Sequence, residues 1–358
     1  MKWRLAAVLV GVATSLSLAG CGSSQKPAPV AQLALVANLD LNSVSRFTLG
    51  IGSQQLAGAG GAAATGVCLS PRYLEMHPTN GLMYVTCQTS NNVAHFMVDR
   101  GTGLLTLVGA PVPAGAAPTT LEFGPQGKFL YVTNLNGNSL SVYAVQSDGG
   151  LKEVPGSPFA TGLLPYTVKV NDAGFVYVTN HNSNTVTVFR SDPATGTLME
   201  IAGSPFASDL GPRAIEFSGK FAFVANRVAD NITVFTVDAS TGALAATGLA
   251  APTGADPRAL AVDASGRFLY VANNAASNVQ VFAMDGTTGG LKEISGSPFA
   301  AGDGPLALEM DSAGKLLYVA NSLGKSVTVF GVDSATGRLQ PQQTLATPGF
   351  ACSVAVLE

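Results

Sequence analysis

Charged residues are scarce in this chain, and neither sign dominates. Its 358 residues include 19 Lys and Arg against 22 Asp and Glu, which together make up 11% and leave a formal net charge of -3. A disordered, charge-rich chain is excluded for most of the length, because 47% of the residues are hydrophobic and can build a large core. The lack of a basic excess also excludes the electrostatic surface with which proteins bind nucleic acid.

Residues and motifs that commonly carry catalysis are scarce as well. The three histidines, His77, His95 and His181, lie in different repeats or strands without ligand spacing, so we expect no metal site. The chain has no G-x-S-x-G elbow, no H-E-x-x-H and no Walker loop. The glycine-rich stretch at 58–61 is not followed by a helix pattern, so we expect no cofactor. His95 precedes Phe96 on a strand, where we expect it to be half-exposed.

No apolar run is long enough for an ordinary membrane span. After Lys2 and Arg4, the apolar stretch from Leu5 to Leu18 is interrupted by polar and small residues, whereas a span needs about 20 apolar residues. This order is typical of an export signal. The residues Leu18-Ala19-Gly20-Cys21 resemble the bacterial lipobox, in which signal peptidase cuts before the cysteine and the thiol carries a diacylglycerol. An ordinary signal peptide with an incidental cysteine is the alternative.

We therefore expect three segments. Residues 1–20 are the lipoprotein signal peptide, 21–32 are the lipidated Cys21 and a Gly/Ser/Pro-rich tether, and 33–358 form the folded domain. The lipid would anchor the protein to a membrane of the cell envelope outside the cytoplasm, and to the outer membrane if the host is Gram-negative.

A four-residue pattern of the type Tyr-Val-Thr-Asn recurs along the chain. The last positions of its seven copies are 38, 87, 134, 180, 226, 273 and 321, with steps of 46 to 49 residues, and an aromatic follows nine residues after each. In the second copy Cys87 replaces the asparagine. A period near 47 residues is typical of a four-stranded propeller blade.

Each repeat supplies signals for four strands. The aromatic lies on an alternating, β-branched segment such as 185–189, and a Gly-containing turn follows it. A third strand ends at Gly-Ser-Pro-Phe, as at 296–299, and a fourth opens after another proline, as at 257–262. We therefore predict an all-β fold, a seven-bladed β-propeller of four-stranded antiparallel blades. Pairing between the N-terminal strand near Leu33 and the C-terminal strand at 352–357 would close the ring; the alternative is an open solenoid.

These repeats resemble the lactonase-type seven-bladed propellers named for their Tyr-Val-Thr-Asn motif. The resemblance covers residues 33–358 and implies the fold. That family includes 6-phosphogluconolactonases, muconate-lactonising enzymes and surface proteins with no established reaction, so membership leaves the activity open.

Propellers bind ligands at the mouth of the central channel, where the innermost strands begin. Three arginines, Arg72, Arg213 and Arg258, follow strand-opening prolines, and Tyr166 holds the same position in blade four. Residues just after the tyrosine-type strands should reach the same face. The resulting candidate ligand-binding set is Arg72, Tyr166, His181, Arg213, Arg227, Arg258 and Asn274.

An arginine cluster suits a small anionic or polyhydroxylated ligand, because each guanidinium offers a planar fork of donors. The alternative is that these arginines pair with Asp209, Asp256 and Asp303 in the neighbouring loops. The faces of a propeller also suit a protein partner. Deeper on the same strands we expect wetted groups in a water-filled channel, namely Glu75, Glu122, Lys169, Glu216 and Glu309.

The lactonase resemblance is weakest at its catalytic positions. Family enzymes carry His on the inner strand of blade four, Pro-Arg-His on blade five, Glu after the next tyrosine-type strand, and Arg on blade seven. The matching residues here are Tyr166, Pro212-Arg213-Ala214, Arg227 and Leu306. Hydrolysis of a lactone needs a base and an oxyanion stabiliser, for which His181 and Arg213 are the candidates. We therefore favour a ligand-binding or interaction role, with an extracytoplasmic lactone hydrolase as the alternative.

The remaining cysteines are Cys68, Cys87 and Cys352, an odd number in a compartment that permits disulfides. Cys68 precedes an inner strand of the second blade and Cys87 ends its antiparallel neighbour, so we expect these two to pair, with Cys352 as the rival partner.

Overall fold

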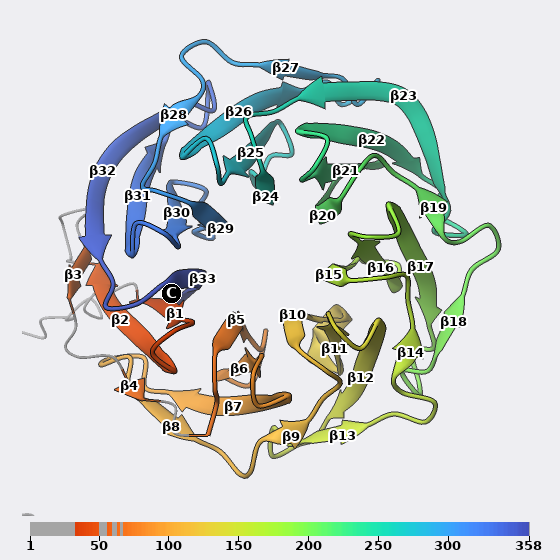
Figure 1. Cartoon of the computed structure of the whole chain (residues 1–358), viewed down its shortest axis with the longest axis vertical. Helices are drawn as coiled ribbons and strands as arrows, with labels where there is room; N and C mark the ends of the chain where they lie inside the picture. The colour runs from red at the N-terminus through yellow and green to blue at the C-terminus, as the bar shows by residue number, and fades with distance from the viewer. Residues whose placement is uncertain (1–32, 50–55, 59–62, 65–66, 358) are drawn as a thin grey trace, which may run out of the picture. The chain divides into compact units, whose positions relative to one another are not determined.

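The computed structural model describes residues 33–49, 56–58, 63–64 and 67–357. Within them, strands form seven antiparallel sheets, and the innermost strands of neighbouring sheets contact one another around a complete circle (Figure 1). The seven-bladed propeller predicted from the repeat is confirmed. The predicted signal peptide, Cys21 and the tether lie outside the described residues, as does most of the glycine-rich stretch at 58–61.

Each blade has the same strand order from the channel outward. The innermost strands are β33 (Ala351–Leu357) in blade one, followed by β5 (Pro71–Met76), β10 (Pro118–Phe123), β15 (Pro165–Val170), β20 (Pro212–Ser218), β24 (Pro257–Val262) and β29 (Pro305–Met310). The second strands, which carry the Tyr-Val-Thr-Asn motif, are β1 (Leu33–Asn38), β6 (Leu82–Cys87), β11 (Phe129–Asn134), β16 (Phe175–Asn180), β21 (Phe221–Asn226), β25 (Phe268–Asn273) and β30 (Leu316–Asn321).

The third strands carry the aromatic of the repeat. They are β2 (Ser43–Leu49), β7 (Asn92–Val98), β12 (Ser139–Val145), β17 (Thr185–Ser191), β22 (Asn231–Val237), β26 (Asn278–Met284) and β31 (Ser326–Val332). The outer strands are β3 (Leu56–Gly58) with β4 (Ala63–Ala64), β8 (Leu105–Leu107) with β9 (Val112–Pro113), β13 (Leu151–Glu153) with β14 (Phe159–Ala160), β18 (Leu198–Glu200) with β19 (Phe206–Ala207), β23 (Leu244–Pro252), β27 (Leu291–Glu293) with β28 (Phe299–Ala300), and β32 (Leu339–Ala346). A short 3-10 turn, η1 (Pro125–Gly127), precedes β11.

The outer strand is interrupted at Gly-Ser-Pro, as predicted, but the chain then returns to the same sheet, which was not predicted. In blade six, β27 ends at Glu293, before Gly296-Ser297-Pro298, and the chain then pairs with β26 again as β28. Pro298 has no N–H to donate, and the Ser297 hydroxyl accepts from the backbone N–H of Val281 at 3.0 Å. The interruption is therefore bridged by a side chain.

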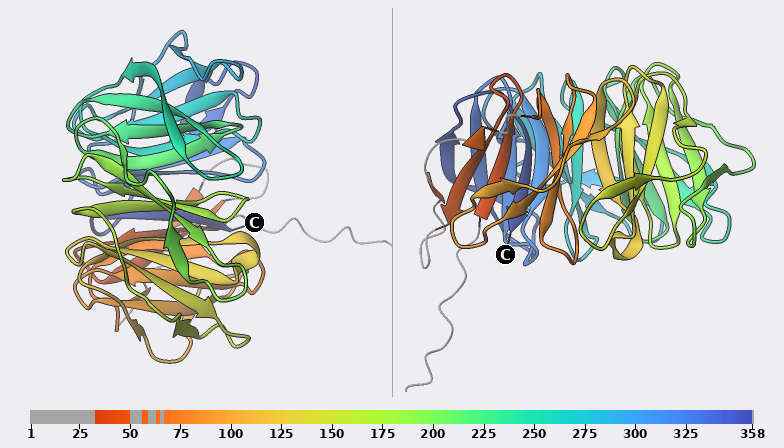
Figure 2. Two further views of the ribbon diagram at one scale, coloured as in Figure 1. Left: turned by 90° about the vertical axis from the view of Figure 1, so that its right-hand side faces the viewer. Right: turned by 90° about the horizontal axis from the view of Figure 1, so that it is seen from below.

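The core lies between blades and not within them. The second strands are buried at every position, because each sheet packs face to face against both of its neighbours. Tyr177 of blade four, for example, is completely buried beside Ile215 and Phe235 of blade five. Its hydroxyl donates to the carbonyl of Gly242 in the next blade's hairpin turn. The repeat therefore encodes contacts between blades, which hold the sheets side by side in Figure 2.

The two ends of the described chain close the ring. The C-terminal strand β33 pairs antiparallel with β1, with Leu35 opposite Ala355, and occupies the innermost position of blade one. The predicted closure is confirmed, and it leaves neither terminal strand as a free edge. No helix among the described residues is long and apolar enough to cross a membrane.

Candidate functional site

A β-bulge places one residue of each inner strand at the channel mouth. In blade five, Pro212 pairs with Asn226 and Ala214 with Ala225, so Arg213 has no partner on β21. Such a bulge leaves the extra residue free of the ladder and re-aims its side chain. The corresponding register shifts in the other blades release the predicted mouth positions, which are Arg72, Thr119, Tyr166, Arg258 and Leu306.

Threonines of the motif fix these bulges across the blade boundary. The Thr179 hydroxyl of blade four donates to the carbonyl of Arg213 in blade five at 2.9 Å, and accepts from the backbone N–H of Thr167 in its own blade. Thr86 and Thr133 do the same for the mouth residues Thr119 and Tyr166. The threonine of Tyr-Val-Thr-Asn therefore positions the mouth residue of the following blade, a role that sequence reasoning missed.

The loops that lead into the inner strands are fixed in a similar way. Asn184, four residues after Asn180, has a left-handed φ of 55°, and its side-chain oxygen accepts from the backbone N–H of Gly211. Asn42, Asn91 and Asn138 cap the corresponding loops of blades two to four. The spacing of four residues after the motif position is visible in the sequence and could have revealed these caps.

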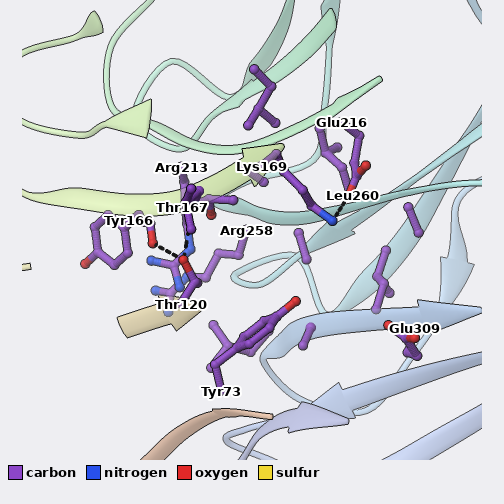
Figure 3. A pocket seen from close by; sticks show the side chains of 18 of the residues that line it. Tyr73, Thr120, Tyr166, Thr167, Lys169, Arg213, Glu216, Arg258, Leu260 and Glu309 are labelled. Carbon is purple, nitrogen blue, oxygen red and sulfur yellow. Dashed lines mark hydrogen bonds and ion pairs between the residues drawn. The ribbon is translucent and has the colours of Figure 1, made fainter. Parts of the chain in front are cut away.

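The inner strands enclose a central cavity of about 440 Å³, lined by residues of all seven blades. Four of the seven predicted ligand-binding residues line it, namely Arg72, Tyr166, Arg213 and Arg258. Tyr73 and Thr120, which were not predicted, line it too. Figure 3 shows the guanidinium groups of Arg213 and Arg258 close to Tyr166 and Thr120, with Tyr73 between them and the deeper charged groups.

Arg213 is the most buried charge at the mouth. Its side chain is 6% exposed, and its guanidinium carbon lies 4.3 Å from the centre of the Tyr166 ring. Among the described residues, no carboxylate pairs with it and no acceptor takes a hydrogen bond from its guanidinium. Burial, together with the charges of Arg72, Arg258 and Arg227, lowers the pKa of Arg213 to about 9. A buried cation without a counter-charge is costly, and an anion in the cavity would relieve that cost.

Arg227 and Arg258 share one carboxylate. Asp256 accepts from Arg227 Nε at 2.7 Å and from Arg258 at 2.6 Å, and both arginine side chains are partly exposed. Burial alone would raise the pKa of Asp256, but the hydrogen bonds and charges of Arg258 and Arg227 lower it. Pairing with a loop carboxylate, the alternative to ligand binding, therefore applies to Arg227 and Arg258. Arg72 and Arg213 have no carboxylate partner among the described residues.

His181 and Asn274 lie at the mouth without lining the cavity. The His181 ring packs edge-on to Tyr166 at 5.5 Å, and its Nδ1 lies 2.9 Å from the Asn182 side-chain oxygen. Its Nε2 is buried, has no hydrogen-bond partner among the described residues, and lies against Gly211. Burial and the charges of Arg227 and Arg213 lower the pKa of His181, so the ring is neutral at pH 7. Asn274 donates to the carbonyl of Pro305 and helps to hold blade seven.

A second charged layer lies deeper in the channel. Lys169 Nζ is 2.9 Å from Glu216 and 3.7 Å from Glu122, and these side chains are 18–25% exposed. Burial raises the pKa of both Glu122 and Glu309 to about 7, and raises that of Glu75 as well. The layer is therefore partly dehydrated and ion-paired, in contrast to the freely wetted groups expected from the sequence.

Cys68 and Cys87 form a disulfide, and Cys352 is a buried free thiol that lines the cavity. In the other blades the asparagine that ends the motif donates to two side chains of the third strand, as Asn134 does to Ser139 and Ser141. In blades three, four, six and seven a glycine packs against that asparagine, three residues before the strand-opening proline, as Gly115 does. Blade two replaces both members of this contact, the glycine by Cys68 and the asparagine by Cys87.

The two other histidines are structural. His77 binds the carbonyl of Gly127 through Nε2 and accepts backbone N–H groups of Thr79 and Asn80 through Nδ1. The expectation for His95 was wrong, because this ring is only 3% exposed and stacks on Tyr84 between two blades. The described part of the chain holds no group of three or more side chains suited to a metal ion.

Comparison with known proteins places this geometry in a family. The model of the family described as lactonase, 7-bladed beta-propeller matches residues 31–123, 116–209 and 202–302. The chain belongs to this family.

Solved structures agree with that assignment. A periplasmic gluconolactonase from Pseudomonas aeruginosa is 20% identical, with a TM-score of 0.79 over 92% of this chain and 99% of that one. A proposed 6-phosphogluconolactonase from Bacteroides fragilis is 19% identical, with the same TM-score and the same coverage. A protein from Lactobacillus plantarum is 21% identical, with a TM-score of 0.82 over 92% and 100%. At these identities the likeness shows the fold alone. No curated protein matches the chain.

Proposed function

We propose that this member of the lactonase family is a ligand-binding lipoprotein of the cell envelope whose central cavity takes a small anionic, polyhydroxylated molecule. The observation that carries the proposal is Arg213, a charged side chain buried at the cavity mouth with no carboxylate beside it among the described residues. Positive charge held in this way is costly to the apo protein, and sites built for a ligand commonly accept such a cost.

The chemistry of the mouth supports this ligand class. A carboxylate or phosphate can accept two parallel hydrogen bonds from a guanidinium fork, and Arg72 lines the same cavity. Thr119, Thr120 and Tyr73 add hydroxyl groups that can bind sugar hydroxyls. The Pseudomonas aeruginosa neighbour is a gluconolactonase, an enzyme named for a polyhydroxylated molecule.

Lactone hydrolysis is the second candidate, favoured by the family and by Arg213, which can stabilise an oxyanion. Its weakness is the base. The Nε2 of His181 is neutral and could accept a proton, but it is buried against Gly211 and does not line the cavity. General-base catalysis needs this atom within hydrogen-bond reach of the attacking water. We therefore propose ligand binding as the first candidate function and lactone hydrolysis as the second.

Calorimetric titration tests the binding proposal. The soluble form that begins at Gly22 is titrated with gluconate, alongside Arg213→Met and the matched control Arg190→Met, whose arginine is exposed on β17. A charge-assisted hydrogen bond contributes about 2–3 kcal/mol, so we expect Arg213→Met to weaken binding roughly 30- to 150-fold. The control should bind like the wild type. Equal affinities in all three proteins would reject Arg213 as the anchor of the site.

A pH-stat assay separates the two candidate functions. Glucono-δ-lactone is added to the wild type, Arg213→Met and His181→Ala. We expect gluconate binding without ring opening above the spontaneous rate. Catalysed opening that both variants abolish would establish the hydrolase instead.

The proposed anchor has its own test. Membrane fractionation and the intact mass of the native protein should show acylation at Cys21, and Cys21→Ala should release the chain from the membrane. A Cys21→Ala protein that stays in the membrane fraction would contradict the lipid anchor.

A further inference from the structure

The charges in the channel form two layers of opposite sign. The mouth layer contains Arg72, Arg213 and Arg258. Three residues further along the same strands stand the deeper groups, since Arg72 is followed by Glu75, Thr119 by Glu122, Tyr166 by Lys169, Arg213 by Glu216 and Leu306 by Glu309. The bulge makes this spacing three instead of two, because it adds one residue between positions that face the channel. Along the regular partner strand the two layers are two to three residues apart, which at roughly 3.3 Å per residue is about 7–10 Å.

The deeper layer holds more carboxyl groups than its one cation, Lys169, pairs with. Lys169 pairs with Glu216 and Glu122. Glu75 and Glu309 have no hydrogen bond or ion pair in the described part of the chain. Glu309 and Glu216 line the same cavity as Arg213. In Figure 3, Arg213 and Arg258 lie on the Tyr166 side of Tyr73, and Lys169, Glu216 and Glu309 lie on the other side.

The two unpaired groups are complementary. At one end of the cavity, the more than nine-tenths buried guanidinium of Arg213 has no counter-ion among the described residues. At the other end, Glu309 faces Glu216 and Glu122 with Lys169 as the nearby cation. A ligand with a single negative charge would pair only with the arginines at the mouth. It would leave Glu309 in the deeper layer without a cation of its own. A cation alone would be repelled at the mouth by three arginines.

We propose that the natural ligand of the central cavity is dipolar, with a carboxylate or phosphate at the arginine mouth and an amine at the glutamate layer. The inference rests on the proposed function and narrows its ligand to a zwitterion such as an amino-bearing acid. Arg213 and Arg72 hold the anionic group, and Glu309 with Glu216 holds the ammonium group. Tyr73, between the layers, contacts the connecting part.

Proton release accompanies such binding. Burial and the charges of Glu216 and Glu122 raise the pKa of Glu309 to about 7, against the lowering effect of Lys169. Tyr73 and Asp263 are further titratable groups that line this cavity, and Glu75 lies near enough for the charge of Glu309 to raise its pKa. A ligand ammonium next to Glu309 lowers its pKa, so a fraction of a proton leaves on binding at pH 7. A ligand that occupies only the mouth leaves this carboxyl unchanged.

Three small probes test the inference by calorimetry on the soluble form. They are 6-aminohexanoate, in which five methylene groups separate the two charges, hexanoate, which carries only the anion, and hexylamine, which carries only the cation. We expect 6-aminohexanoate to bind at least 10-fold more tightly than hexanoate, and hexylamine to bind most weakly. In buffers of different ionisation enthalpy, the zwitterion should release protons and hexanoate should not.

Two variants assign the effect to the deeper layer. Glu309→Gln should erase the preference for the zwitterion and leave hexanoate affinity unchanged, whereas the exposed Glu293→Gln on β27 should change neither. Equal affinity of the wild type for hexanoate and 6-aminohexanoate would overturn the dipolar ligand and leave the anion site intact. Failure of gluconate and of all three probes to bind would overturn the proposed function as well.

Discussion

Blade two offers a direct test of how the repeat holds its strands together. Cys68 and Cys87 are both completely buried, and their disulfide closes a loop with a sequence separation of 19. For a loop of this length, the restriction of the unfolded chain contributes about 3 kcal/mol to stability. We therefore expect Cys68→Ala with Cys87→Ala to lower the free energy of unfolding by about 3 kcal/mol, with a further contribution from the two small cavities.

Guanidinium unfolding with and without reductant measures this contribution. The wild type should lose about 3 kcal/mol when reduced, and the Ala pair should be insensitive to reductant. For a domain of this size the loss corresponds to roughly 4–5 °C in Tm. An Ala pair as stable as the oxidised wild type would refute the reasoning.

A repeat-restoring variant is the matched control. Cys68→Gly with Cys87→Asn rebuilds the Gly···Asn contact of blades three, four, six and seven, and Asn92 already stands where the asparagine needs its first acceptor. Adding Ala94→Ser supplies the second acceptor, as Ser141 does in blade three. This variant should regain about 1–2 kcal/mol over the Ala pair, because two buried hydrogen bonds return. No recovery would show that the polar contact does not substitute for the disulfide.

Three further predictions concern stability, each measured by denaturant unfolding. Gly242→Ala should cost about 2–4 kcal/mol, because its φ is +75° and a Cβ would clash with the Phe175 ring. Gly248→Ala, at φ +77° with open space around it, should cost only about 1 kcal/mol, and equal costs for the two variants would contradict the packing argument. Arg213→Met should be at least as stable as the wild type, because it removes a buried charge that lacks a carboxylate, and a marked loss would assign Arg213 a structural role. Glu309→Gln should be more stable than the wild type by about 1–3 kcal/mol at pH 8 and about equal at pH 4.5. The folded pKa of about 7 lies above the ordinary value of 4.5, so the wild type loses stability as pH rises between them; a pH-independent difference would contradict this shift.

The fold was predictable because the repeat records contacts that recur in every blade. The spacing of Tyr-Val-Thr-Asn and the proline before each inner strand set the number of blades and the positions at the mouth. The closure of the ring by β33 was predictable because the C-terminal strand has no following strand to pair with, and the first blade lacks an innermost strand of its own. The disulfide was predictable because β5 and β6 are antiparallel. Pro71, at the start of β5, lies opposite Cys87, so Cys68, three residues earlier, comes close to Cys87.

The charge state of the site was less predictable, because it depends on contacts between residues far apart in sequence. Whether Asp256 pairs with Arg213 or with Arg258 depends on the conformation of its loop. In the structure Asp256 pairs with Arg258 and Arg227. The burial of His181 Nε2 depends on Gly211 of the next blade, which no local pattern records. His95 was placed wrongly for the same reason, since it stacks on Tyr84 on the face of its sheet that packs against the next blade.

The central claim is that Arg213 anchors an anion inside the ring of blades. A crystal structure of the soluble form with gluconate tests it most directly. We predict the carboxylate in the central cavity, within hydrogen-bond distance of the Arg213 guanidinium and beside Tyr166. Gluconate bound elsewhere on the propeller, with Arg213 still without an anion, would contradict the claim.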